Sequence, residues 1–159
     1  MRNHILAALS ALVLLTTCTP AAASPAEPGL YSIDLGEQQK LTCMLFDEPS
    51  TEALIVASCA AGFPVTWKLL DGAHEQAAKL DISRTETGEL SVDASKEPLI
   101  TTMVVPTEIT EPTVINGLYV VPGDNEVRFF ATDPKVNPVL ITPDSYEVVE
   151  DSAAKVGAT

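Results

Sequence analysis

The cysteines are the residues whose chemistry and spacing say most about this chain. Cys43 and Cys59 would close a loop of roughly 16 residues if they paired, which is worth about 3 kcal/mol in the chain-entropy model. With His74 as the one histidine beyond the first few residues, they make a poor zinc set. No Cys-x-x-Cys pair of the thioredoxin type is present. In an oxidising compartment two such thiols normally pair, so we predict a Cys43–Cys59 disulfide and neither a metal nor a cofactor.

Few other residues are arranged for catalysis. The sequence contains no Gly-x-Ser-x-Gly, no phosphate-binding glycine loop and no His-Glu-x-x-His. A serine or cysteine triad needs a histidine base, and the position of His74, just after Asp71-Gly72, is typical of an exposed loop. Asp124-Asn125-Glu126 offers oxygens that calcium accepts, but the pattern is more typical of a turn. We predict a protein without catalysis; the alternative is an enzyme with a carboxylate site among its 22 acids.

The N-terminus has the layout of an export signal. A short basic start precedes an apolar run over Ile5–Leu15, and Ala21-Ala22-Ala23 then offers a small-x-small cleavage site. The apolar run is too short to cross a bilayer of about 30 Å at 1.5 Å per residue. We therefore predict that residues 1–23 are removed and that the protein is exported to the periplasm or secreted.

Cys18 offers a second way of processing the same stretch. Leu15-Thr16-Thr17-Cys18 resembles a bacterial lipobox, although Thr17 stands where Gly, Ala or Ser is usual. Lipidation of Cys18 would tie the mature chain to a membrane. We favour cleavage after Ala23, so that contact with a membrane is expected only if Cys18 is lipidated.

The net charge of the chain limits the kinds of molecule that it is expected to bind. The chain has 9 basic and 22 acidic residues and a net charge of −13, with no block of like charges. Such a balance argues against nucleic acid and anionic lipid, because both require Lys and Arg to neutralise phosphates. Scattered acids are typical of a surface that favours solubility, and the alternative is an electrostatic bias toward a basic partner or a cation.

The pattern of the mature chain is that of short strands separated by Gly and Pro. Residues 24–28 should be an extended N-terminal segment, and alternating runs then predict hairpins, in one of which Asn116-Gly117 fits a type I′ turn. The run Ala53–Ala61 fits either a short helix or a strand, and we favour the strand. The other strands are predicted at 30–35, 41–46, 65–70, 80–83, 90–92, 99–105, 114–115, 118–119, 127–131, 139–142 and 146–149.

These elements indicate one all-β domain over residues 29–150, an antiparallel β-barrel or sandwich of short strands with one disulfide. We expect a barrel-like part over 29–97, additional strands over 98–150 and a flexible tail over 151–159. Trp67 is predicted to be a core ring near the disulfide, with a ligand platform as the alternative.

One family resemblance spans roughly residues 29–92. The order of Gly29-Leu30-Tyr31, Leu41-Thr42-Cys43, Ser58-Cys59 and Val65-Thr66-Trp67 resembles that of the bacterial inhibitors of alkaline metalloproteinases and their lipoprotein relatives. The resemblance implies a small exported β-barrel with one disulfide. It also implies that the residues ahead of the barrel, here Ser24, Pro25 and Ala26, enter the cleft of the protease.

We therefore expect an exported, non-catalytic binding protein with a protein partner. Inhibition of an exported protease is the leading specific hypothesis. The alternative is a cell-envelope lipoprotein, or a periplasmic interaction module, without inhibitory activity. An inhibitor needs a rigid scaffold and a pre-ordered segment rather than a catalytic set.

Overall fold

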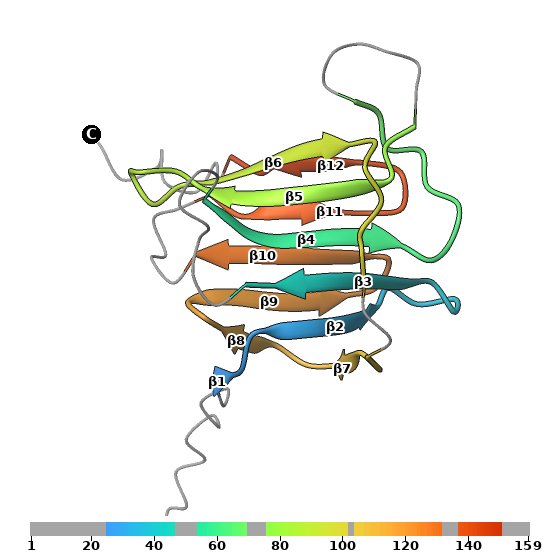
Figure 1. Ribbon diagram of the computed structural model, residues 1–159, viewed down its shortest axis with the longest axis horizontal. Helices are drawn as coiled ribbons and strands as arrows, with labels where there is room; N and C mark the ends of the chain where they lie inside the picture. Colours follow the sequence, from blue (N-terminus) through green and yellow to red (C-terminus); the bar gives the residue numbers. More distant parts are fainter. Residues whose placement is uncertain (1–24, 47–53, 70–75, 102–103, 132–136, 151–159) are drawn as a thin grey trace, which may run out of the picture.

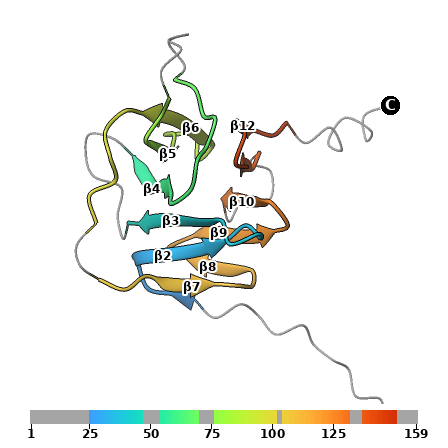
Figure 2. The ribbon, with the colours of Figure 1, turned by 90° about the vertical axis from the view of Figure 1, so that its right-hand side faces the viewer.

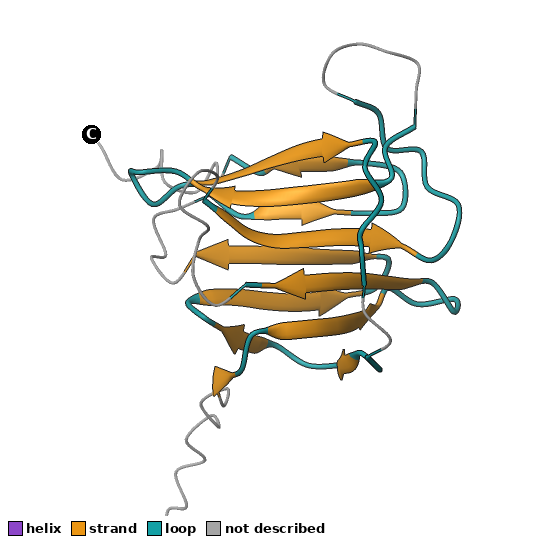
Figure 3. Cartoon of the chain, viewed as in Figure 1, coloured by secondary structure: helices purple, strands orange, loops and turns teal. Residues whose placement is uncertain are grey.

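The computed structural model describes residues 25–46, 54–69, 76–101, 104–131 and 137–150. These residues form twelve β-strands in two stacked sheets whose strands run roughly along one axis, and the described residues contain no helix (Figures 1, 2 and 3). None of them therefore forms a helix that could cross a membrane. Cys18, Ser24, His74, the predicted export signal and the tail over 151–159 lie outside the described residues.

The two halves of the chain each build one layer. Sheet I has the strand order β6-β5-β4-β3-β2-β7, and sheet II has the order β1-β8-β9-β10-β11-β12. The strands of sheet I are β2 (Gly29–Asp34), β3 (Lys40–Leu45), β4 (Ile55–Ala61), β5 (Lys79–Arg84), β6 (Leu90–Ser95) and β7 (Thr107–Ile109). Those of sheet II are β1 (Pro25–Ala26), β8 (Thr113–Ile115), β9 (Leu118–Gly123), β10 (Glu126–Ala131), β11 (Val139–Ile141) and β12 (Tyr146–Val148).

The all-β prediction is confirmed, and of its two architectures the chain adopts the sandwich. Residues 29–95 form five neighbouring strands of one open sheet rather than a barrel, because the strands after Thr113 supply the second layer that covers their apolar face. The layers also exchange edge strands. Short β1 pairs in parallel with β8 in sheet II, and β7 pairs in parallel with β2 in sheet I.

The core lies between the sheets and follows the period of two that a half-buried strand requires. On β3, Leu41, Cys43 and Leu45 alternate with less buried residues, and β10 shows the same pattern. Cys43 and Cys59 lie directly opposite each other on β3 and β4, with 4.0 Å between their Cα atoms, and they form the predicted disulfide. Both are fully buried, so the bond lies within the core.

The hairpin predictions are confirmed where turn chemistry is explicit. Asn116 and Gly117 have φ of 45° and 71° and join β8 to β9, as a type I′ turn requires. The pairs β2–β3, β5–β6 and β11–β12 form where the alternation predicts them. The ambiguous run before Ala61 is the strand β4.

Two strand predictions are wrong. Residues 65–69 form only one isolated bridge, from Lys68 to Gln76, and no strand occurs at the described positions of 99–105. In the first case β4 ends at Ala61, and the Thr66 N–H then bonds to the Pro143 carbonyl in the turn between β11 and β12 instead of pairing within sheet I. In the second case the chain runs across the strands instead of along them.

We call this second segment the outer strap: residues 96–101 and 104–106, which connect β6 to β7. These strands are the opposite edges of sheet I, and Figures 1 and 2 show the strap passing over the outer face of that sheet. The five gaps between six strands amount to about 24 Å. A helix of the same length would rise only about 17 Å, so the connection has to be extended. Thr102 and Met103 lie outside the described residues.

Candidate functional site

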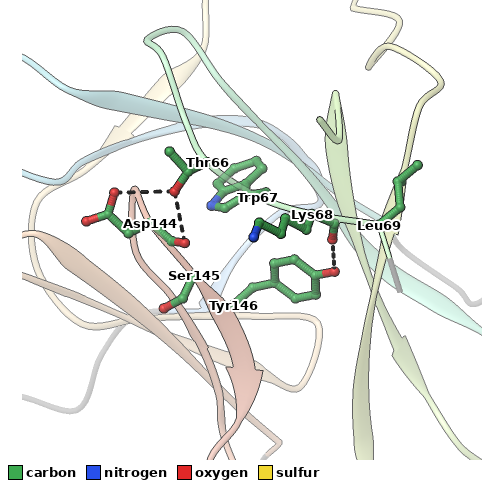
Figure 4. A pocket seen from close by; sticks show the side chains of 7 residues that line it. All are labelled: Thr66, Trp67, Lys68, Leu69, Asp144, Ser145 and Tyr146. Carbon is green, nitrogen blue, oxygen red and sulfur yellow. Dashed lines mark hydrogen bonds between the residues drawn. The ribbon is translucent and has the colours of Figure 1, made fainter. Parts of the chain in front are cut away.

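An open groove of about 670 Å³ lies at one end of the sandwich, where the connection between β4 and β5 meets the turn between β11 and β12 (Figure 4). We call that connection the inner connection: residues 62–69 and 76–78. The groove is therefore lined by both halves of the chain. Its lining residues are Thr66, Trp67, Lys68, Leu69, Asp144, Ser145 and Tyr146.

Trp67 forms the inner wall of this groove as part of the core. Its ring is 1% exposed, and its Nε1–H donates to the carbonyl oxygen of Thr142 at 2.8 Å. The hydroxyl of Thr66 donates to the carbonyl oxygen of Asp144 at 3.1 Å. Because a buried indole needs a partner for its N–H, these bonds fix the inner connection to sheet II. The prediction of a core ring is confirmed, and a ring buried this deeply presents no face to a ligand.

Tyr146 closes the groove from the other side in the same way. Its hydroxyl donates to the carbonyl oxygen of Lys68. Burial raises the pKa of the Tyr146 phenol above 10.0, and the negative charge of Asp93 raises it further, so the phenol stays a neutral donor. Most of the polar groups that reach the groove thus join the inner connection to sheet II. This arrangement fits a structural seam better than a reaction centre.

The residues that sequence reasoning singled out for catalysis or metal binding are not brought together. His74 lies outside the described residues. Asp124 and Asn125 form the two-residue turn between β9 and β10, while Glu126 accepts from Arg128 Nε at 2.9 Å. Across the described ranges, no three His, Cys, Asp or Glu side chains gather where they could hold a metal ion.

Sequence reasoning missed one polar cluster on the outer face of sheet I. The Ser58 hydroxyl donates to the Asp81 carboxylate, and Lys79 Nζ lies 2.8 Å from Asp81 Oδ2. Ser58 is 4% exposed, and the Lys79 and Asp81 side chains are 15% and 14% exposed. A substrate has little access to this hydroxyl. Only the pairing of β4 with β5 brings Ser58 opposite Asp81, so no local motif reveals the cluster.

The predicted N-terminal segment is extended and attached at its described end. Pro25 and Ala26 form β1 and lie beside Val114 and Ile115 of β8. Just after it, the Tyr31 hydroxyl donates to the carbonyl oxygen of Glu27. The chain therefore enters the sandwich in a fixed direction from Pro25 onward.

The outer strap carries the most exposed apolar side chains of the described residues. Ile100, Val104 and Val105 are 83%, 59% and 87% exposed, and Val148, on β12, follows at 37%. The sequence predicted a strand here, in which part of this run would have been buried. The observed segment instead combines large aliphatic side chains with an extended main chain in solvent.

Comparisons with known proteins add no assignment. No family model, curated protein or solved structure matches this chain. The resemblance to metalloproteinase inhibitors therefore stays a prediction, and function has to be argued from the groove, the N-terminal segment and the outer strap.

Proposed function

We propose that this chain is an exported, non-catalytic protein-binding domain whose target is an exported protease. The observation that supports it best is the clustering of exposed apolar side chains. Three of the four most exposed large hydrophobic residues of the described chain lie on the outer strap. Single exposed apolar residues are ordinary, but contiguous ones mark interaction surfaces.

The scaffold has the rigidity that a binding protein uses. The buried disulfide joins β3 to β4, and Trp67 joins the inner connection to sheet II. A rigid body lowers the entropy lost on association, because fewer groups have to be ordered when the partner arrives. The same body would also suit a structural module, so rigidity supports binding without identifying the target.

The N-terminal segment remains our proposed contact with the protease. If the signal is cleaved after Ala23, Ser24 is the first residue and lies directly ahead of β1. Pairing of Pro25 and Ala26 with β8 would then present the new N-terminus in a set direction. Entry deeper into a cleft would require this two-residue pairing to open.

The test compares two purified forms of the protein on a panel of zinc endoproteases. One form begins at Ser24 and the other at Gly29, which removes β1 and leaves sheet I intact. We expect the longer form to inhibit at least one enzyme and the shorter form to be roughly tenfold weaker. Equal inhibition by both forms, or none by either, rejects the N-terminal mechanism.

A second candidate is a cell-envelope lipoprotein, and the position of β1 favours it. If Cys18 is the lipidated first residue, residues 19–24 separate the lipid from Pro25. Six residues can span at most about 20 Å, so the lipid would hold the sandwich within that distance of the membrane. Intact-mass measurement of the native protein decides between the two: a diacylglyceryl mass on Cys18 supports the lipoprotein, and a chain that begins at Ser24 eliminates it.

A further inference from the structure

We propose that β6 (Leu90–Ser95) is a self-association edge, through which two copies of this chain pair antiparallel about a twofold axis. Such pairing is independent of the target named above, so it goes beyond the proposed function. β6 forms the edge of sheet I opposite to β7, and no strand of the described chain lies beyond it (Figure 1). This edge is therefore open to a further strand.

β6 is the one long edge strand of the described chain. The two sheets have four edges, formed by β1, β7, β12 and β6, and the first three of these strands are only two or three residues long. β6 has six residues and pairs with β5 over its whole length without a bulge. Proteins commonly protect an edge with a short strand, a bulge, a Lys or a Pro. Within β6 none of these occurs, and Asp93 is its one charged residue.

Every second residue of β6 turns its main-chain N–H and C=O groups outward. The Thr85 N–H bonds to the Glu89 carbonyl at 2.8 Å and closes the β5–β6 hairpin. Antiparallel pairing alternates from there, so the next residues of β6 that bond to β5 are Ser91 and Asp93. The residues between them turn these groups to the open edge: Leu90, Val92 and Ala94. Among the described residues, the outward groups have no hydrogen-bond partner.

The sequence of β6 fits a second copy of itself in one register. Outward residues have to face outward residues across the twofold axis, and the register that uses all three places Val92 opposite its own copy. Leu90 then faces Ala94 of the second copy, so that apolar side chains meet on the core side. On the outer face, Ser91 faces Asp93 of the second copy. A shift of two residues toward the C-terminal end would place Asp93 opposite its own copy, and like charges in that position are destabilising.

Pairing through this edge gives a closed dimer. A twofold axis uses the same edge of both copies, and the described residues contain no second long edge through which a fibre could grow. Both copies are acidic, with a net charge of −13 on the full chain, so they repel each other. Association should therefore become tighter as added salt screens this repulsion.

Sedimentation of the form that begins at Ser24, over a range of protein and NaCl concentrations, measures the dimer. Two variants test the register: Ser91→Asp places a carboxylate opposite Asp93 of the second copy, and Ser91→Lys places an ammonium group there. The matched controls are Ser83→Asp and Ser83→Lys, because Ser83 lies opposite Ser91 on β5, one strand farther from the edge. They change the net charge equally without facing the second copy. Thermal unfolding of each variant checks that it is folded.

We expect an equilibrium between monomer and dimer whose dissociation constant falls as salt is raised. At low salt, Ser91→Asp should raise this constant roughly tenfold and Ser91→Lys should lower it by a similar factor, whereas each change at Ser83 should alter it by no more than about twofold. A monomer at every concentration overturns the proposal. So does a dimer whose dissociation constant responds no more to the charge at Ser91 than to the charge at Ser83.

Amide hydrogen exchange identifies the edge itself. Raising the protein concentration should slow exchange at the outward amides, which are those of Leu90, Val92 and Ala94. The amides of Ser91 and Asp93 bond within sheet I and should be protected at every concentration. A dimer without this alternation associates through another surface and overturns the proposal. Protection of the outward amides in the monomer also overturns it, because another segment of the same chain would then cover the edge.

Discussion

The inner connection and the outer strap are both long connections within sheet I, and both contain an apolar run that alternation predicts to be a strand. The inner connection turns its largest side chain, Trp67, into the core at 1% exposure. The outer strap leaves Ile100 and Val105 more than four-fifths exposed. Two similar sequence patterns in one small domain therefore differ in burial: one is part of the core and the other is exposed to solvent.

The difference comes from what each connection meets. The inner connection reaches the turn between β11 and β12, where the Thr142 and Pro143 carbonyls accept its N–H groups. The outer strap has to cross from one edge of sheet I to the other over the outer face of that sheet, where the Ser58, Asp81 and Lys79 groups already bond to one another. A segment becomes part of the fold when both its apolar and its polar groups find partners, and it stays available for binding when neither does.

The largest expected effect is on the inner connection. Trp67→Ala should lower the free energy of unfolding by about 4 kcal/mol, since it leaves a cavity and orphans the Thr142 carbonyl. Urea denaturation measures the loss, and Lys68→Ala, with an exposed side chain, is the control and should stay within about 0.5 kcal/mol. A loss below about 1 kcal/mol for Trp67→Ala would contradict the claim that the inner connection is held in the core by Trp67.

Loss of the disulfide should come next. Cys43→Ala/Cys59→Ala is expected to cost about 3 kcal/mol, because the unfolded chain regains the freedom of the closed loop. Denaturation in parallel with an inhibition assay sharpens the comparison. While the protein remains folded, inhibition of a protease should be unchanged. A fall in inhibition that exceeds the unfolded fraction would show that binding depends on the disulfide itself.

Tyr146→Phe should lower the free energy of unfolding by a smaller amount, about 1 kcal/mol at neutral pH, because the hydrogen bond to the Lys68 carbonyl is lost. The pKa of Tyr146 is raised from 10.0 by burial and by Asp93. The unfolded chain therefore releases this proton first, and the parent loses stability as pH rises above about 10. Unfolding measured between pH 8 and pH 11 should show a shallower decline in the variant. An identical decline in both proteins would contradict the claim that folding raises the pKa of Tyr146.

The smallest effect on stability is expected in the outer strap. Ile100→Ser/Val105→Ser should change the free energy of unfolding by no more than about 0.5 kcal/mol, since both side chains are already in water. Chemical denaturation beside the parent protein measures it. A loss above about 1.5 kcal/mol would mean that the strap packs against the sheet and would overturn its role as a free segment.

Local chemistry made much of the fold predictable. Asn116-Gly117 specifies its turn through φ, and the alternation of Leu41, Cys43 and Leu45 specifies a face. Pattern alone could not show that two halves form two sheets, because that depends on which strands meet over the core. The same limit applies to the sites: Trp67 was placed in the core by its type, whereas exposure of the outer strap follows from the path between β6 and β7.

Amide hydrogen exchange on the free protein tests the contrast between the two connections most directly. The N–H groups of Thr66 and Ala77, which bond to Pro143 and Trp67 at 3.2 and 3.1 Å, should be protected. Those of Ile100 and Val105 should exchange nearly as fast as in an unstructured peptide. Protection of the strap amides comparable to that of Thr66 would show that the strap is held by the fold, and would contradict the claim that it is left free for a partner.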